Sequence, residues 1–169
     1  MPFIRISDEY DDDGKMLNPI VEYAPPEAYR YQDFKEDFSK EEKAMLELLR
    51  SIGASELMVR YDGGSDEGFA HAESVRIHGE KKSLGDAVAA LNTPEKVARL
   101  LAKPNPYLNK LTAELLLEET LEELAEAFAV RLLGSGYGTG EYELAGAFTA
   151  NLATLEMVDD LNARPADWK

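Results

Sequence analysis

Apolar residues recur at helical spacing in three parts of the chain. The first is 40–52, where they return every three or four positions. Just before it, Ser39 and Glu42 form a capping box, a pair whose side chains bond to the free backbone amides at a helix start. The same spacing predicts short helices over 83–101. Thr93 and Pro94, a cap and a first-turn proline, mark the start of the second one. A long helix is predicted over 111–133.

Other segments alternate between apolar and polar residues, which is typical of strands with one buried face. Strands are predicted over 56–62 and 69–77, and three glycines in 63–68 favour a loop that joins them as an antiparallel hairpin. Two more strands are predicted over 142–149 and 153–158. We therefore expect an α+β fold in the order α-β-β-α-α-β-β, with a four-stranded antiparallel sheet of two hairpins packed by helices.

The beginning of the chain differs from the rest, because its prolines interrupt regular structure and only 3–6 and 20–23 are candidate short strands. We expect an aromatic N-terminal arm over 1–38 that docks on its own domain or another chain, an α+β domain over 39–160 and a polar tail over 161–169. The first forty residues hold seven of the fifteen aromatic side chains: Phe3, Tyr10, Tyr23, Tyr29, Tyr31, Phe34 and Phe38.

The amino-acid composition excludes several kinds of structure and chemistry. The 169 residues are 44% hydrophobic, which argues against wholesale disorder, and the lack of cysteine excludes disulfides, cysteine-ligated metals and thiol catalysis. The net charge is −15, of which −9 falls in 111–169 with twelve acids and three bases. Such a surface repels phosphate backbones. It is typical of a protein that binds a basic partner, or of a protein that itself imitates nucleic acid. Solubility alone is the other explanation.

No part of the sequence has the roughly 18–20 consecutive apolar residues of a membrane span. The apolar run at the start is too short for a signal peptide and is followed at once by acidic residues. The long helix over 111–133 is interrupted by six glutamates and Arg131. We therefore expect a cytoplasmic protein without membrane contact.

The acidic residues of the predicted 63–68 loop are the sharpest chemical feature. Asp62, Asp66 and Glu73 match positions one, five and twelve of a calcium loop, but Glu67 stands where that loop needs glycine. Magnesium held by two carboxylates would require a phosphate substrate, which the negative surface disfavours. His71 is a candidate general base or ligand. The alternative is a turn in which Asp62 bonds to backbone amides.

Two further patterns have plain structural explanations. The glycines of 134–140 resemble a phosphate-binding loop, yet they follow a helix, whereas a dinucleotide loop follows a strand and opens a helix. The glutamates of 111–133 form a solvated helix face, although their mutual repulsion would be relieved by a basic partner. No known catalytic motif is present.

The segment 61–68, Tyr-Asp-Gly-Gly-Ser-Asp-Glu-Gly, resembles a small uncharacterised family of bacterial and phage proteins with a Tyr-Asp-Gly, Gly-Asp-Glu-Gly signature. The likeness covers 43–158 and extends to Gly140-Glu141-Tyr142, which follows a glycine-rich turn. That turn departs from the family, which has a tryptophan and an Asn-Asp pair there. Since the family has no assigned activity, the resemblance implies a fold and a loop of interest but no function.

These observations lead to one expectation and two alternatives. We expect a non-enzymatic acidic protein-interaction module of a bacterial or phage accessory system, which binds a protein with a basic surface and needs no cofactor, nucleic acid or membrane. The alternatives are a nucleic-acid-mimicking inhibitor of a basic DNA- or RNA-binding protein, and a metal-dependent hydrolase using Asp62, Asp66, Glu67 and His71. The oligomeric state stays open.

The candidate site has two parts, and no catalytic or metal-ligating residue is assigned. Contact residues on the loop and arm are Tyr61, Asp62, Asp66, Glu67, Tyr29, Tyr31 and Phe34, and the acidic helix face consists of Glu118, Glu119, Glu122, Glu123 and Glu126.

Overall fold

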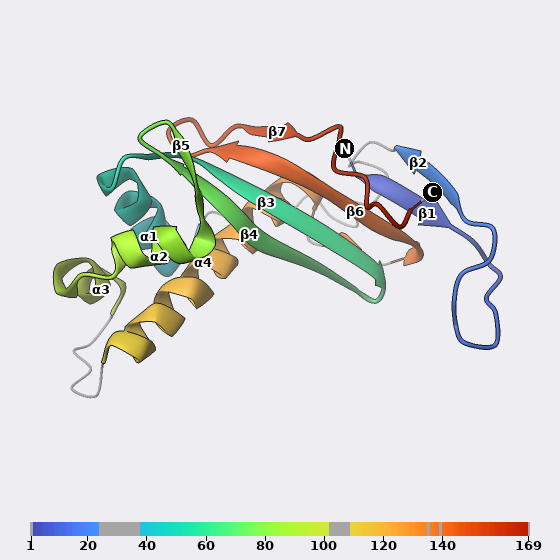
Figure 1. Cartoon of the computed structure of the whole chain (residues 1–169), viewed down its shortest axis with the longest axis horizontal. Helices are drawn as coiled ribbons and strands as arrows, with labels where there is room; N and C mark the ends of the chain where they lie inside the picture. The colour runs from blue at the N-terminus through green and yellow to red at the C-terminus, as the bar shows by residue number, and fades with distance from the viewer. Residues whose placement is uncertain (1, 24–37, 102–108, 135, 139, 169) are drawn as a thin grey trace.

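The computed structural model describes residues 2–23, 38–101, 109–134, 136–138 and 140–168. Its elements follow one another along the chain as strands, helices and strands again (Figure 1). Their bounds are β1 Phe3–Ile6, β2 Ile20–Tyr23, α1 Lys40–Ser51, β3 Ala54–Ser65, β4 Glu67–Ile77, β5 Glu80–Ser83, α2 Leu84–Leu91, α3 Pro94–Leu100, α4 Lys110–Leu133, β6 Gly140–Asn151 and β7 Met157–Asp159.

The strands form one antiparallel sheet of seven, so the expected four-stranded sheet and the expected order α-β-β-α-α-β-β are both wrong. The order is β2-β1-β6-β3-β4-β5, and β7 pairs with β6. Both β1 and β7 use the same edge of β6, at Glu143–Ala145 and Phe148–Ala150 respectively. The α+β class and the β3–β4 hairpin are confirmed.

The three additional strands are short and lie toward the sheet margins, where sequence patterns are weakest. β1 and β2 were predicted as extended pieces, but their pairing with each other and with β6 depends on contacts far apart in the sequence. β5 reads Glu-Lys-Lys-Ser, which lacks the alternation of apolar and polar residues that predicts a strand. An edge strand tolerates such charged residues, since one side of it faces solvent.

Each helix begins directly after a residue whose side chain caps it. Ser39 accepts a hydrogen bond from the Glu42 amide, and the Glu42 carboxylate accepts one from the Ser39 amide, which completes the predicted capping box of α1. α2 and α3 are capped by Ser83 and Thr93. α4 begins after Asn109, whose side chain accepts from the Thr112 amide.

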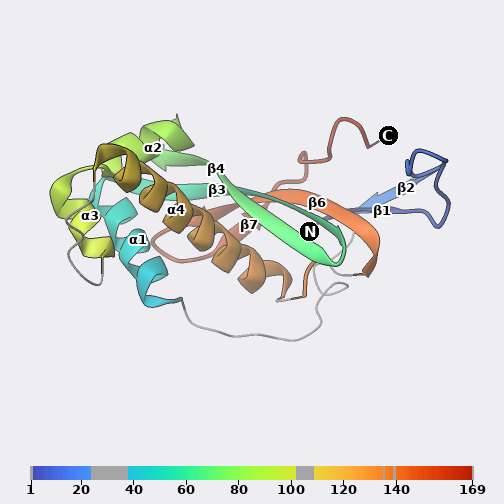
Figure 2. The ribbon, with the colours of Figure 1, turned by 90° about the horizontal axis from the view of Figure 1, so that it is seen from below.

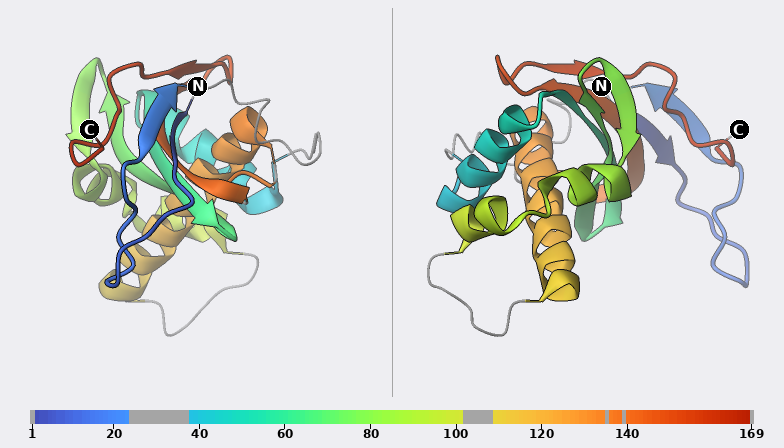
Figure 3. Two further views of the ribbon diagram at one scale, coloured as in Figure 1. Left: turned by 90° about the vertical axis from the view of Figure 1, so that its right-hand side faces the viewer. Right: turned by 60° about the vertical axis from the view of Figure 1, so that its left-hand side comes forward.

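All four helices lie on one side of the sheet, which gives a two-layer arrangement (Figures 1, 2 and 3). α4 crosses beneath β3 and β4, and α1 and α2 flank it (Figure 2). The interface is apolar and fully buried, which supplies the main hydrophobic stabilisation of the fold. Its largest side chains include Leu57, Tyr61 and Phe148 from the sheet and Leu49, Leu121, Leu124 and Phe128 from the helices.

The opposite face of the sheet is only partly covered, and we call it the open face. Ala145 and Ala147 of β6 stand on this face, opposite Asp62 and Arg60 of β3, and both are buried. The Asp160 amide donates to the Ala147 carbonyl, which fixes the start of the C-terminal segment 160–168. Arg60 and Asp62 of β3, which stand beside these alanines in the register, stay exposed.

Glycines let the end of the β3–β4 hairpin interlock with the turn after α4. A Cβ atom on Gly138 would lie 2.6 Å from the Gly68 Cα, and one on Gly63 would lie 2.8 Å from the Gly138 Cα. A Cβ on Gly68 would overlap the Tyr137 ring. The backbones therefore meet at a distance that no larger residue permits, and we call these residues (Gly63, Gly68, Tyr137 and Gly138) the glycine interlock.

We expect Gly68→Ala to lower the free energy of unfolding by roughly 1–3 kcal/mol, because overpacking of a close contact costs about that much. Gly85→Ala is the matched control. A Cβ at Gly85, in the first turn of α2, has only the Ser83 hydroxyl nearby, at 3.9 Å. That variant should be neutral or more stable by up to about 1 kcal/mol. Urea unfolding measures both, and equal effects would contradict the interlock.

Candidate functional site

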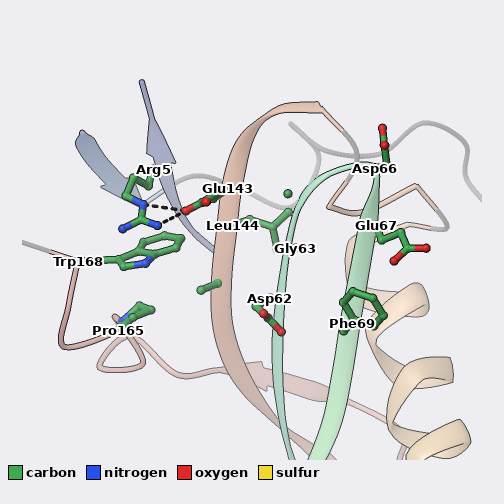
Figure 4. Close-up of a pocket in the computed structure, with 12 residues that line it drawn as sticks. Arg5, Asp62, Gly63, Asp66, Glu67, Phe69, Glu143, Leu144, Pro165 and Trp168 are labelled. Atoms are coloured by element: carbon green, nitrogen blue, oxygen red, sulfur yellow. Dashed lines mark hydrogen bonds and ion pairs between the residues drawn. The ribbon is translucent and has the colours of Figure 1, made fainter. Parts of the chain in front are cut away.

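A trough of about 690 Å³ lies on the open face beside the end of the β3–β4 hairpin (Figure 4). Its floor is low, because Gly63, Gly64 and Ala145 carry no side chain or only a methyl group. Asp62 and Phe69 rise on one side, and Trp168 and Pro165 on the other (Figure 4). The remaining lining residues are Arg5, Asp66, Glu67, Glu143 and Leu144.

Arg5 of β1 is held firmly at one end of the trough. Its Nε donates to Glu143 Oε2 at 2.8 Å, and its Nη2 contacts the same oxygen (Figure 4). Its guanidinium carbon lies 4.6 Å from the centre of a Trp168 ring, which is a cation–π contact. Trp168 is in turn fixed by Arg164, whose Nε donates to the Trp168 carbonyl at 2.7 Å.

The acidic residues on the hairpin side of the trough have no such partner. No described residue forms a salt bridge with Asp62, Asp66 or Glu67, and all three are exposed. Phe69 is the register partner of Asp62 and is 50% exposed, although it is a large apolar side chain. The hairpin side of the trough therefore combines exposed carboxylates with an exposed aromatic ring.

The predicted 63–68 loop is mostly strand. Gly63 pairs with Gly68 and Gly64 with Glu67, and Ser65 still pairs with Gly140 of β6, so only Asp66 lies between the two strands. The glycines that suggested a flexible loop serve the glycine interlock on one face and the trough floor on the other. Asp62 accordingly lies within a paired strand rather than in a turn.

Tyr61, which sequence analysis placed with the contact residues, is fully buried under the helices. Its hydroxyl donates to Asp159 Oδ1 at 3.4 Å across Gly146, whose missing side chain leaves room for the ring. Tyr23 of β2 donates to the other oxygen of Asp159. Asp159 therefore ties the N-terminal hairpin to the centre of the sheet.

The aromatic arm is described only in part. Tyr29, Tyr31 and Phe34 lie outside the described residues. Phe38 is buried and meets Phe128 of α4 edge to face, with 5.2 Å between ring centres. Its ring also lies under the Arg131 guanidinium, at 4.4 Å.

The glutamates at 118, 119, 122, 123 and 126 lie on one side of α4 and line a shallow hollow of about 490 Å³. The row runs beside β4, because Glu122 contacts His71 at 3.1 Å and Glu126 accepts a hydrogen bond from the Ala70 backbone. The edge of β4 at this level has no pairing strand among the described residues, since β5 reaches only Ser74–Ile77. Glu126 therefore covers part of a strand edge, a recognised way of blocking unwanted pairing.

Glu126 is a partly buried carboxylate of this row. Burial raises its pKa above the usual range, and this outweighs the opposite effect of hydrogen bonds from Tyr137 and Ala70 and of nearby His71. The Tyr137 hydroxyl donates to Glu126 Oε2 at 2.6 Å. Burial, followed by this bond, raises the pKa of Tyr137 far above its ordinary value, so Tyr137 remains a donor.

The residues named for a metal-dependent hydrolase are divided between two places. Asp62, Asp66 and Glu67 border the trough, whereas His71 does not line it and faces Glu122 of α4. Within the described part of the chain, no three histidine or carboxylate side chains are placed to hold a metal ion.

No motif in the sequence assigns Arg5, Glu143, Pro165 or Trp168 to a site, although the fold brings all four to the trough. The presence of Trp168 gave one signal, since it is the only aromatic residue in a segment expected to be a polar tail. Arg5 and Glu143 are 138 positions apart, so nothing local in the sequence connects them.

Comparison with known proteins finds no match for the chain. No family model, no curated protein and no solved structure matches it significantly. The resemblance of 43–158 to a bacterial and phage family therefore stays a prediction. No helix in the described residues has the length and apolar character needed to cross a membrane.

We expect Glu126→Gln to flatten the dependence of stability on pH. A raised native pKa means that the folded protein keeps this proton at pH values where the unfolded chain, with the ordinary value of 4.5, has lost it. The contribution of Glu126 to stability is therefore greatest below pH 4.5 and falls as pH rises through the native pKa. Glutamine keeps an oxygen that accepts the Tyr137 hydrogen bond and has no charge to desolvate.

Urea unfolding of both proteins from pH 4 to pH 7 provides the measurement. The free energy of unfolding of the variant should increase relative to the original protein as pH rises. Glu123→Gln, an exposed member of the same row, is the control and should change this difference less. A relative stability that declines with pH would show that the Tyr137 and Ala70 hydrogen bonds outweigh burial.

Proposed function

We propose that this protein is a non-enzymatic interaction module that binds a basic surface of another protein. The observation that carries the proposal is the placement of carboxylates on two sides of the exposed β3–β4 hairpin. The α4 glutamates follow the edge of β4, and Asp62, Asp66 and Glu67 border the trough on the open face.

The nearby cations support this proposal because they are already paired. Arg5 contacts Glu143, and Arg60 contacts Glu73 at 3.5 Å. Among the described residues, none forms a salt bridge with Glu118, Glu119 or Glu123. The hairpin region therefore carries an excess of negative charge that its own side chains do not neutralise.

The spacing along α4 adds an energetic argument. Glu118 and Glu122, Glu119 and Glu123, and Glu122 and Glu126 are each four residues apart, and like charges at that spacing destabilise a helix by roughly 0.2–0.5 kcal/mol per pair. Cations of a bound partner would relieve this repulsion. Binding of this type is guided by long-range attraction and weakens with salt.

We expect the triple variant Glu118→Gln, Glu119→Gln, Glu123→Gln to bind a basic partner about tenfold more weakly, because exposed charge pairs contribute roughly 0.5 kcal/mol each. The probe is a short labelled peptide of alternating lysine and arginine with glycine spacers, measured by fluorescence anisotropy at increasing NaCl. Affinity for the original protein should fall steadily with salt.

The control neutralises three exposed acids elsewhere, Glu9→Gln, Glu47→Gln and Glu156→Gln, and equalises the net charge of the two variants. If both variants lose affinity equally, total charge and not the α4 surface governs binding, and the proposal fails. A basic protein captured by this module and then displaced by DNA in a salt-dependent way would identify nucleic-acid mimicry as its mode of action.

A further inference from the structure

We infer that the trough on the open face is a receptor site for an arginine side chain of the partner, held by Asp62 and Phe69. This inference deepens the proposed function, because it names the group that the acidic module recognises. It rests on the shape of the trough, on its unpaired carboxylates and exposed ring, and on a contact of the same kind that the chain makes with its own Arg5.

The trough has the composition of a guanidinium site. Asp62 and Phe69 are cross-strand neighbours on the open face, and side chains in such pairs stand roughly 5 Å apart at their Cβ atoms. A planar guanidinium can therefore lie on the Phe69 ring while its N–H groups donate to the Asp62 carboxylate. Asp66 and Glu67 add negative charge at the hairpin end.

The opposite end of the trough shows this recognition within the chain. Arg5 lies over the Trp168 ring and donates to Glu143, so one guanidinium is already held between an aromatic face and a carboxylate (Figure 4). Phe69 and Asp62 offer the same two groups with no described cation between them. The trough thus holds one filled and one open position for the same type of group.

The shape of the trough floor limits which segment of the partner can place an arginine there. Gly63, Gly64 and Ala145 leave the backbone level with the bottom of the trough, and Trp168 and Pro165 wall its far side. An extended segment with small residues beside its arginine fits there. Lysine is a poorer match, because its ammonium is compact, strongly hydrated and unable to pair in a planar fork.

The test uses three blocked peptides that are identical except for arginine, lysine or citrulline at one position between glycines and serines. Each is titrated into the ¹⁵N-labelled protein and followed by NMR. The arginine peptide should produce saturable shifts at the amides of Gly63, Gly64, Phe69 and Ala145, and it should bind several-fold more tightly than the lysine peptide. Citrulline has the shape of arginine without its charge and should not saturate.

Variants assign the binding to the two side chains. Asp62→Asn should weaken the arginine peptide about tenfold, in line with loss of a charge-assisted hydrogen bond, and Phe69→Leu about threefold through loss of the ring face. Both residues are exposed, so both variants are expected to fold. Glu47→Gln on α1 and Leu161→Ala in the C-terminal segment are exposed controls that should bind normally.

The outcomes separate this inference from the proposed function. Equal affinity for arginine and lysine, or normal binding by Asp62→Asn, overturns the arginine site. Shifts confined to the α4 row overturn it as well, while the interaction module itself stands. The α4 triple variant could lose binding of the basic peptide while the trough variants bind it normally. That result would also overturn the arginine site and leave the interaction module standing.

Discussion

The close approach of backbones in the glycine interlock is the constraint on which the rest of the structure depends. It lets the turn after α4 lie directly against the β3–β4 hairpin, and this brings Tyr137 to Glu126. The same contact fixes the hairpin end, from which Asp62, Asp66 and Glu67 reach the open face. One packing requirement therefore positions the acidic groups on both sides of the sheet.

Local signals in the sequence predicted most of the helical layer and the central hairpin. Ser39 with Glu42, Ser83 and Thr93 begin helices where capping chemistry requires. These helix starts depend on hydrogen bonds between residues three positions apart. Such short spacings can be recognised directly in the sequence. The strand alternation that placed Leu57, Val59 and Tyr61 on one face is likewise local, and all three are buried.

What the sequence could not reveal depends on distant pairing. The N-terminal hairpin joins the sheet because β1 finds β6, about 140 positions later, and nothing near Phe3–Ile6 predicts that partner. The trough has the same origin, since Arg5, Asp62, Glu143 and Trp168 come from four separate parts of the chain. The 63–68 glycines were misread because a glycine cluster looks the same whether it serves a flexible loop or a tight contact.

Trp168 is the only tryptophan of the protein, and it forms a wall of the trough with Arg5 stacked upon it. Its indole emission consequently comes from a single known location, without contributions from elsewhere in the fold. Any rearrangement that lifts the C-terminal segment from the sheet would expose that buried indole to water and shift its emission to longer wavelength. The chain thus carries a built-in optical reporter of whether this segment is seated on the sheet.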